Sequence, residues 1–452
     1  MKKIELSDHF GKKELLLYSL PAIGNMLAIT SFQLVDGYFV SDLLGLNAFV
    51  AVNLVSPVFF ILYAIGFMVG SGTSAQAAQY LGEGDAKTGR EIFSMSLLVM
   101  TLAGILLGAV FAVLMPQIAP LIGAKAGNIS YCVEYGRILL YFLPAFLINA
   151  AFQSLWITAE KSTLGFVISV IEGGLNIGLD WLFMAVYKMG VTGAALASSL
   201  ASLFAAAFCV LYFCRKRKSE LYFVRFPLSR VKELGQILFN GFSDLVDSVS
   251  GNITELVMNR LLVRYIGDPG VAAFGVYNYV TEIFMAIFYG VSSTAVTVVG
   301  YKCGAKQRKE LDGLLKNGSQ LMATVGVAMC ALCFLLARPI ARLYLDYDLD
   351  AMDITVHALK ICSFAYLLTG LNIYISSFFT GLEDGLSSAI IALFSSLLAP
   401  LATAVLLPAL FGGDALWYSV PLASVVTLLV ALPLLRYRYY GRPEIAAPGK
   451  TE

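Results

Sequence analysis

Hydrophobic positions in this chain gather into long uninterrupted blocks, separated by short polar segments. An α-helix needs about 20 apolar residues to cross roughly 30 Å of hydrocarbon, and many of the blocks reach that length. We therefore expect an all-α polytopic membrane protein with twelve transmembrane helices. The predicted spans are residues 14–40, 47–71, 91–115, 131–157, 163–187, 191–214, 236–265, 269–298, 312–338, 353–379, 386–410 and 416–437.

One long basic tract divides the spans into six and six. It carries Arg215, Lys216, Arg217, Lys218, Arg225, Arg230 and Lys232. We expect an N-lobe at residues 1–214, a cytoplasmic linker at 215–235, a C-lobe at 236–437 and a cytoplasmic tail at 438–452.

The other basic residues favour one orientation in the membrane. Cytoplasmic loops carry an excess of Lys and Arg. The N-terminus, the loops after the second and eighth predicted spans, and the C-terminus are all basic and fall on the linker side. We expect a multi-pass protein of the cell (inner) membrane with both termini in the cytoplasm.

The two halves resemble each other in sequence. Asp36 precedes "GLNAFVAVN" and Gly84, whereas Glu255 precedes "GDPGVAAFGVYN" and Gly304 at almost the same spacing. A repeat with an even number of spans keeps its orientation, which predicts a pseudo-two-fold axis along the membrane normal. A chance likeness between two helical bundles is the alternative interpretation.

Composition narrows the functional classes. The chain is 58% hydrophobic and 13% charged, whereas soluble domains are about 25% charged. A net charge of +1 provides no basic surface for nucleic acid. Cys330 and Cys333 form a C-x-x-C inside an apolar block, which favours two buried thiols over a redox pair. With two His and no nucleophile–base or metal constellation, we expect neither an enzyme nor a cofactor other than a coupling ion.

Carboxylates inside predicted spans are the main candidates for function. A charged side chain at the bilayer centre costs roughly 2.5–3.5 kcal/mol on insertion scales, so such residues face a cavity or a partner. Asp36 has Gln33 one turn before it. Glu172, Asn176 and Asp180 follow one another every four residues and share one helix face. A proton, or sodium held by these oxygens, would suit that line.

Further polar residues leave alternatives open. Ser198, Ser199 and Ser202 could bind a cation or only link helices, and linking is favoured for Ser199 and Ser202. Asp244 and Asp247 are more simply interpreted as a solvated face near the cytoplasm, whereas Glu255 lies in mid-span. Possible lumen-lining residues are Gln33, Glu172, Asn149, Gln153, Glu282 and Asn372. Asn149 and Gln153 could equally well only link helices.

These residues and their order resemble the multidrug and toxic compound extrusion (MATE) family. The resemblance covers about residues 12–437 and rests on "LVDGYFVSDLLGLNAFVAVNL", "GSGTSAQAAQYLGEGD", "LNIGLDWLF" and "GVTGAALASSLAS". It implies two six-helix lobes forming a V, and export of organic cations and other xenobiotics in exchange for inward protons or sodium.

The resemblance also implies roles for particular residues. Asp36, Asn176, Asp180 and Ser198 would form the cation-coupling site of the N-lobe, the first three being metal ligands if the ion is sodium. Glu255 matches an acid of the seventh helix, but the tenth helix offers Thr369 or Asn372 in place of an Asp, and Glu172 has no counterpart.

The expected partners are drug-like organic cations and the lipid bilayer, with no nucleic acid and a monomeric chain. The alternative functions are a flippase for lipids or lipid-linked oligosaccharides from the same superfamily and, less favoured, a membrane-embedded enzyme.

Overall fold

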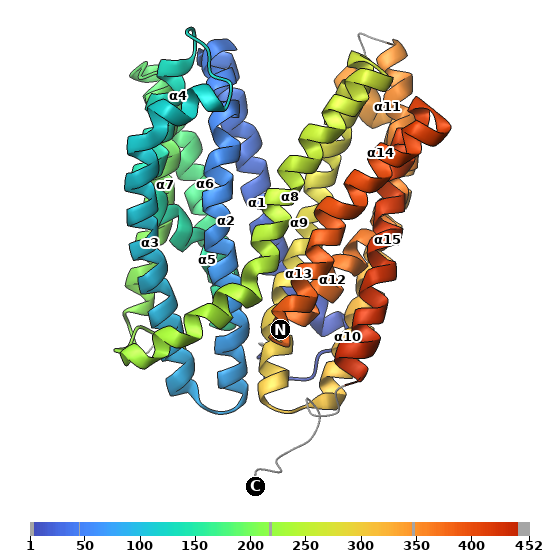
Figure 1. Cartoon of the computed structure of the whole chain (residues 1–452). Helices are drawn as coiled ribbons and strands as arrows, with labels where there is room; N and C mark the ends of the chain where they lie inside the picture. The colour runs from blue at the N-terminus through green and yellow to red at the C-terminus, as the bar shows by residue number, and fades with distance from the viewer. Residues whose placement is uncertain (1–3, 45, 217–218, 346–348, 442–452) are drawn as a thin grey trace. The chain divides into compact units, whose positions relative to one another are not determined.

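The structure, a computed structural model, describes residues 4–44, 46–216, 219–345 and 349–441. Within these ranges all regular secondary structure is helical, as the sequence predicted. The chain divides into two compact units, described one at a time below (Figure 1). The N-terminal unit is Pro21–Gly241, and the C-terminal unit is Met1–Leu20 together with Phe242–Glu452.

The N-terminal unit begins within its first helix and ends within the helix after the linker. Its elements are α1 (Lys12–Leu44, from Pro21), α2 (Leu46–Gly82), α3 (Ala86–Leu121), α4 (Ile129–Tyr141), α5 (Leu143–Thr158), α6 (Ser162–Asp180), the π-helix η1 (Trp181–Val186), α7 (Val191–Phe213), the 3₁₀-helix η2 (Leu228–Glu233) and the start of α8 (Leu234–Tyr265).

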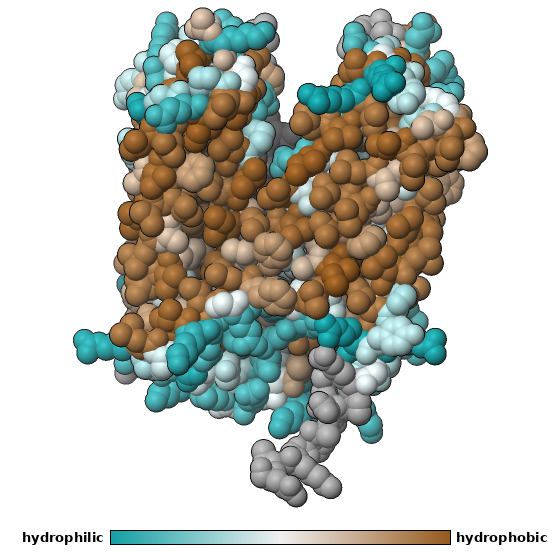
Figure 2. All heavy atoms as spheres, in the orientation of Figure 1, coloured by the Kyte–Doolittle hydropathy of each residue, from teal (hydrophilic) through white to brown (hydrophobic). Residues whose placement is uncertain are grey.

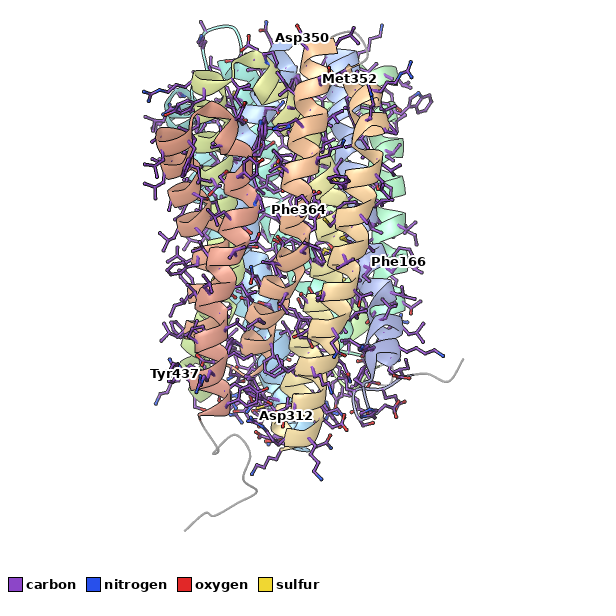
Figure 3. The ribbon with its side chains drawn as sticks, turned by 90° about the vertical axis from the view of Figure 1, so that its right-hand side faces the viewer. Phe166, Asp312, Asp350, Met352, Phe364 and Tyr437 are labelled. Atoms are coloured by element: carbon purple, nitrogen blue, oxygen red, sulfur yellow. The ribbon has the colours of Figure 1, made fainter. Side chains whose placement is uncertain are left out.

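The C-terminal unit repeats this order. Its elements are the rest of α8, α9 (Asp268–Gly304), α10 (Arg308–Leu345), α11 (Leu349–Cys362), η3 (Ser363–Ala365), α12 (Tyr366–Gly381), α13 (Gly385–Leu393), the π-helix η4 (Phe394–Leu398), α14 (Ala399–Phe411), η5 (Gly413–Tyr418), α15 (Ser419–Leu434) and η6 (Leu435–Tyr440). Figure 3 places Asp312 of α10 and Tyr437 of η6 at one end of this unit, and Asp350 of α11 at the other.

The fourth and fifth spans are interrupted in both units. α4 and α5 meet at an angle of 60°. Pro144 accounts for that bend, because proline lacks an N–H and its ring clashes with the carbonyl of Leu140 four residues earlier. In the C-terminal unit the 3₁₀ turn η3 separates α11 from α12, and Phe364 in that turn lies between the two ends of the unit (Figure 3). The fifth spans contain η1 and η4, so the repeat extends to local irregularities.

Matching turns give the register of the repeat. After α2, the N–H groups of Gly84 and Asp85 bond the carbonyls of Leu81 and Tyr80. After α9, Lys306 and Gln307 make the same two bonds, to Cys303 and Lys302. Gly84 and Lys306 both have positive φ, at 84° and 56°. This helix-ending motif pairs Gly84 with Lys306, two residues beyond the Gly304 that the sequence spacing suggested.

Small residues allow α2 and α5 to pack closely in the N-terminal unit. A Cβ added at Gly66 would come within 2.7 Å of the Leu147 carbonyl oxygen, and one at Gly70 within 2.5 Å of the Ala151 Cα. Such backbone contact is typical of helix packing in membranes. No hydrophobic force drives helices together in lipid, and small residues let the backbones approach closely enough for van der Waals packing.

Polar contacts explain why the units do not divide at the predicted lobe boundaries. Residues 1–20, expected in the N-lobe, belong to the C-terminal unit, where Lys302 donates to the Ser7 carbonyl (2.9 Å) and Asn317 to that of Phe10 (3.3 Å). The expected linker, 215–235, belongs to the N-terminal unit together with Gly241. The N–H of Val224 bonds Ser94 of α3 (2.9 Å) there.

The described helices have the length and apolarity of membrane spans. Ten of them could cross a membrane, or eleven if α4 and α5 form one span. α8 is not among them, because Asp244, Asp247 and Glu255 lower its apolarity. On the face shown in Figure 2, apolar residues cover the middle of each unit and polar residues gather at its ends.

Candidate cation-binding site

The polar line predicted in the fifth span lies on α6 of the N-terminal unit. Glu172, Asn176 and Asp180 are four residues apart and share one face. Asn176 is 9% exposed and Asp180 is fully buried. The helix therefore carries a carboxylate inside the unit, where an ionised group is costly without a compensating charge.

Asn176 is joined to α7. Its side-chain nitrogen donates to the Ser198 hydroxyl at 3.2 Å. The structure thus brings together two of the four residues that the resemblance assigns to cation coupling. An amide oxygen and a hydroxyl beside a buried acid are oxygen ligands of the kind that hard cations prefer.

The other end of the line contacts α5. The Asn149 amide donates to Glu172 Oε1 at 2.5 Å. Gln153, one turn after Asn149, is buried and accepts a hydrogen bond from Asn25 of α1. Of the two interpretations of Gln153, this contact supports the one in which the side chain links helices.

Asp180 is also the last α-helical residue before the π-helix η1. A π-helix widens the backbone by bonding over five residues instead of four, and such segments occur frequently at functional sites. The buried acid therefore lies where the helix changes its hydrogen-bonding register.

The side chains of Asp36 and Gln33 lie outside the described residues, although their backbone belongs to α1. The pairing of Asp36 with Asp180 therefore stays a prediction.

Two exposed acids lie near each other in the C-terminal unit. Glu255 of α8 accepts a hydrogen bond from Asn278 of α9 at 3.5 Å. Glu282 is one turn beyond Asn278 and interacts electrostatically with Glu255. These carboxylates form a small acidic surface on α8 and α9 that a cationic molecule could contact.

The tenth-span residues considered as replacements for an acid have packing roles. Asn372 is 2% exposed and donates to the Ser424 carbonyl of α15 at 2.9 Å. The Thr369 hydroxyl lies 3.1 Å from that of Ser424. Asn372 does not line a lumen surface, because it is directed into a neighbouring helix.

Sequence reasoning missed the environment of Asp247. The expected solvated face near the cytoplasm is wrong for this residue, because Tyr289 donates to its Oδ2 at 2.7 Å and Ser396 donates to its Oδ1. The sequence signal was present, since an acid inside the seventh predicted span needs a partner.

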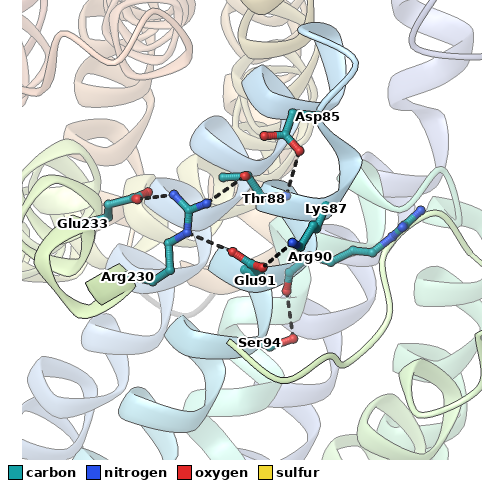
Figure 4. A network of polar contacts seen from close by, with 8 residues as sticks. All are labelled: Asp85, Lys87, Thr88, Arg90, Glu91, Ser94, Arg230 and Glu233. Atoms are coloured by element: carbon teal, nitrogen blue, oxygen red, sulfur yellow. Dashed lines mark hydrogen bonds and ion pairs between the residues drawn. The ribbon is translucent and has the colours of Figure 1, made fainter. Parts of the chain in front are cut away.

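A second network missed from the sequence lies at one end of α3 (Figure 4). Arg230 of η2 donates to Glu91 (2.9 Å), Glu233 (2.7 Å) and Thr88 (2.9 Å). The hydrogen bonds that Arg230 donates to Glu233 and then to Glu91 raise the pKa of Arg230. Asp85 caps α3 through the N–H of Thr88 (3.1 Å), and its hydrogen bonds with Thr88 lower the Asp85 pKa. These contacts fasten residues 228–233 to α3.

The two buried thiols of the C-x-x-C have separate partners. Cys330 lies 3.8 Å from the Ser363 hydroxyl and Cys333 3.8 Å from the Leu359 carbonyl, and both are free cysteines. Within the part of the chain that the structure describes, no group of three or more His, Cys, Asp and Glu could hold a metal ion.

Comparison with known proteins agrees with this fold. The Multidrug export protein MepA of Staphylococcus aureus (strain MSSA476) is 24% identical over 426 residues, covering 93% of this chain and 92% of that protein. MepA of Staphylococcus haemolyticus (strain JCSC1435) is 22% identical over 424 residues, with the same coverage.

Solved structures share the fold over nearly the whole chain. The crystal structure of MATE in complex with MaL6 has a TM-score of 0.91 at 24% identity, covering 98% of this chain and 99% of that one. An outward-facing multidrug resistance MATE family transporter of the MOP superfamily has a TM-score of 0.90 at 23% identity, covering 98% of each chain.

The family model MatE matches residues 21–182 and again residues 245–405, which is the repeat that the turns and interrupted helices display. The chain therefore belongs to the MatE family, the multidrug and toxic compound extrusion family that its sequence resembles.

Proposed function

We propose that this protein is a secondary antiporter that exports organic cations and drug-like xenobiotics in exchange for inward protons or sodium. The observation that carries the proposal is the buried Asp180 on the same helix face as the Asn176–Ser198 pair. Similarity to multidrug export proteins over 93% of the chain supports the choice of substrate class.

Cation binding at Asp180 would work by neutralisation. The bound ion removes the cost of a buried charge, and its loss toward the cytoplasm restores that charge. The ion shifts the conformational equilibrium only through its different affinities for the two states. The widened backbone of η1, next to Asp180, is the element that would respond.

The energies are compatible with a small ion as driver. A hundredfold drug gradient costs about 2.8 kcal/mol, and one charge crossing 100 mV yields about 2.3 kcal/mol. Exchange of one monovalent drug cation for one proton cancels the electrical term. Two bound ions would restore it.

A flippase for lipids or lipid-linked oligosaccharides is not favoured, because the MepA proteins of Staphylococcus aureus and Staphylococcus haemolyticus, to which the chain is similar, are multidrug export proteins. The acids of α6, α8 and α9 also attract cations, whereas the phosphate groups of such lipids call for Arg and Lys.

The test is dye efflux from proteoliposomes with the pH gradient and the sodium gradient imposed separately. One gradient should drive efflux of a cationic dye by the wild-type protein. Asp180→Asn should abolish ion-driven efflux and keep part of the dye binding, because Asn is nearly isosteric. Glu134→Gln is the matched control, since Glu134 is an exposed acid of α4 outside the polar line. Wild-type efflux by Asp180→Asn would show that the line is structural.

We also propose that both termini are cytoplasmic. A membrane-impermeant label at Lys216 should then react only from the cytoplasm, and one at Lys125 only from outside. Reaction of both from one side would overturn this topology.

A further inference from the structure

Asp247 is a carboxylate that the proposed function leaves unused. Tyr289 of α9 donates to Oδ2 at 2.7 Å, and Ser396 of η4 donates to Oδ1. Each carboxylate oxygen therefore receives a hydroxyl from a different helix. Such an arrangement fixes the orientation of the carboxylate and defines a site that joins α8, α9 and the fifth span of the C-terminal unit.

The charged groups around Asp247 are compatible with the binding of a cation there. Tyr289 contacts Asp247, and Asp244, one turn earlier on α8, interacts electrostatically with the same tyrosine. α13, η4, α14 and α15 contain no titratable side chain. α12 carries Tyr366 and Tyr374, whose hydroxyls contact Thr281 (2.7 Å) and the Leu314 carbonyl (2.7 Å). The hydroxyl dipoles of Tyr289 and Ser396 face the Asp247 carboxylate, and a bound cation would neutralise its charge.

The close hydroxyls favour a proton over sodium. Tyr289 and Ser396 each take one acceptor position of the carboxylate, so a sodium ion would have to use the remaining positions and gather further oxygen ligands around it. A proton needs no such ligands. It makes the acid a donor through one oxygen, and the hydroxyl on that oxygen then accepts instead of donating.

Ser396 links this site to the backbone of η4. Thr254 of α8 donates to the Ser396 carbonyl at 2.6 Å, so α8 holds Ser396 by both its hydroxyl and its carbonyl. Reversal of the Asp247–Ser396 hydrogen bond changes one of these two attachments. In the N-terminal unit Asp180 directly precedes η1, so each unit places a carboxylate at the π-helix of its fifth span.

We propose that Asp247, Tyr289 and Ser396 form a proton-binding site of the C-terminal unit, and that its occupancy alters the attachment of α8 to η4. Only the biological use of this proton-binding site depends on the proposed antiport function. Proton binding itself is measurable without drug or gradient, so failure of the efflux experiment leaves this test intact.

The test is infrared difference spectroscopy of the purified protein in lipid, acid minus alkaline buffer without sodium. Wild-type protein should show a carboxylic acid C=O band that Asp247→Asn lacks. Tyr289→Phe and Ser396→Ala should keep that band at a shifted frequency, because each removes one hydrogen bond to the acid. Ser388→Ala is the matched control and should leave the band unmoved, since the Ser388 hydroxyl donates to the Gly385 carbonyl of α13 (3.1 Å).

Identical spectra of wild type and Asp247→Asn would overturn the proposal. A wild-type band absent at every pH, with a spectral change on addition of sodium that Asp247→Asn lacks, would also overturn it and assign sodium to the site. Should Asp247→Asn fail to fold, the comparison of two serine variants decides. Equal band positions in Ser396→Ala and Ser388→Ala contradict the assignment, and a shift in Ser396→Ala alone supports it.

Discussion

Asp180 and Asp247 are two carboxylates within the helical units, each next to the π-helix of a fifth span. Asp180 is next to η1 in the sequence, and Asp247 is next to η4 through a side-chain contact. Asp180 belongs to α6 itself, whereas Asp247 reaches Ser396 of η4 from α8. The acids therefore occupy comparable places in the two units without being equivalent in sequence.

Asp85, the N-cap residue of α3, contributes to the stability of the protein. Hydrogen bonds from the Thr88 side chain and then from the Thr88 N–H to its carboxylate lower the pKa of Asp85. A lowered folded-state pKa means that the stabilisation is complete at neutral pH and is lost as the pH falls through that pKa. We expect Asp85→Ala to destabilise the protein by about 1 kcal/mol at neutral pH, the usual value of an N-cap.

Asp85→Asn is the control for this prediction, because Asn caps helices as well as Asp but does not titrate. Thermal unfolding followed across acidic pH should show a stability loss in the wild type that is smaller in Asp85→Asn. Parallel pH profiles for these two proteins would refute the assignment.

Residue spacing predicted part of the candidate site and missed the rest for a physical reason. The four-residue repeat of Glu172, Asn176 and Asp180 placed them on one face, and the structure joins Asn176 to Ser198. Spacing tells which face a residue occupies but not which helix covers that face. Asn372 and Asp247 were misinterpreted for that reason, since their partners Ser424 and Tyr289 are distant in sequence.

At the scale of elements, apolar block length predicted the helices but not their interruptions. The residues of η1 and η4 are as apolar as their surroundings, so a π-helix leaves no trace in hydropathy. Pro144 could have indicated the bend between α4 and α5. No proline lies in the 3₁₀ turn η3, so the sequence carries no such signal for the break there.

The turn after α9 provides a test of backbone strain. Lys306 has a φ of 56° at a position where its counterpart in the repeat is Gly84. Non-glycine residues pay roughly 1 kcal/mol in this left-handed region. We expect Lys306→Gly to raise the free energy of unfolding by up to about 1 kcal/mol.

The control is Lys316→Gly, an exposed lysine inside α10, which should lower stability by about 1 kcal/mol. Thermal unfolding in one detergent compares both variants with the wild type. Destabilisation by both glycines to the same extent would show that the turn is unstrained.

At the scale of the whole molecule, the linker is held on the N-terminal unit by Arg230. Glu91 is 7% exposed and Arg230 is 26% exposed, so the pair is only partly shielded from water. Removal of Arg230 leaves the buried Glu91 carboxylate with the exposed Lys87 ammonium, 4.0 Å away, as its ion-pair partner. We expect Arg230→Met to destabilise the N-terminal unit by about 2 kcal/mol, below the value for fully buried pairs because of that exposure.

Arg230→Met should also speed tryptic cleavage at Arg215 and Lys216, both exposed, because residues 228–233 lose their attachment to α3. Adding Glu91→Gln should recover part of the lost stability, since the buried charge that lost Arg230 is then gone. Additive losses in the double variant would contradict coupling between these residues.

The last prediction compares the two units through Asp36 and Glu255. Both are acids at matching places of the sequence repeat, so symmetry alone assigns them equal importance. Their surroundings differ, however. Asp36 is expected to work with the buried Asp180, whereas Glu255 is exposed beside Asn278, and the tenth-span residues Thr369 and Asn372 are used to bind α15.

We therefore expect Asp36→Asn to eliminate coupling for every substrate, because it removes a carboxylate from the ion site. Glu255→Gln should reduce efflux of a cationic dye more than that of a neutral dye, because it removes charge from an exposed acidic surface. Efflux of both dyes at several external pH values measures the difference. Loss of both activities in Glu255→Gln together with coupled transport by Asp36→Asn would place ion coupling in the C-terminal unit and reverse the assignment.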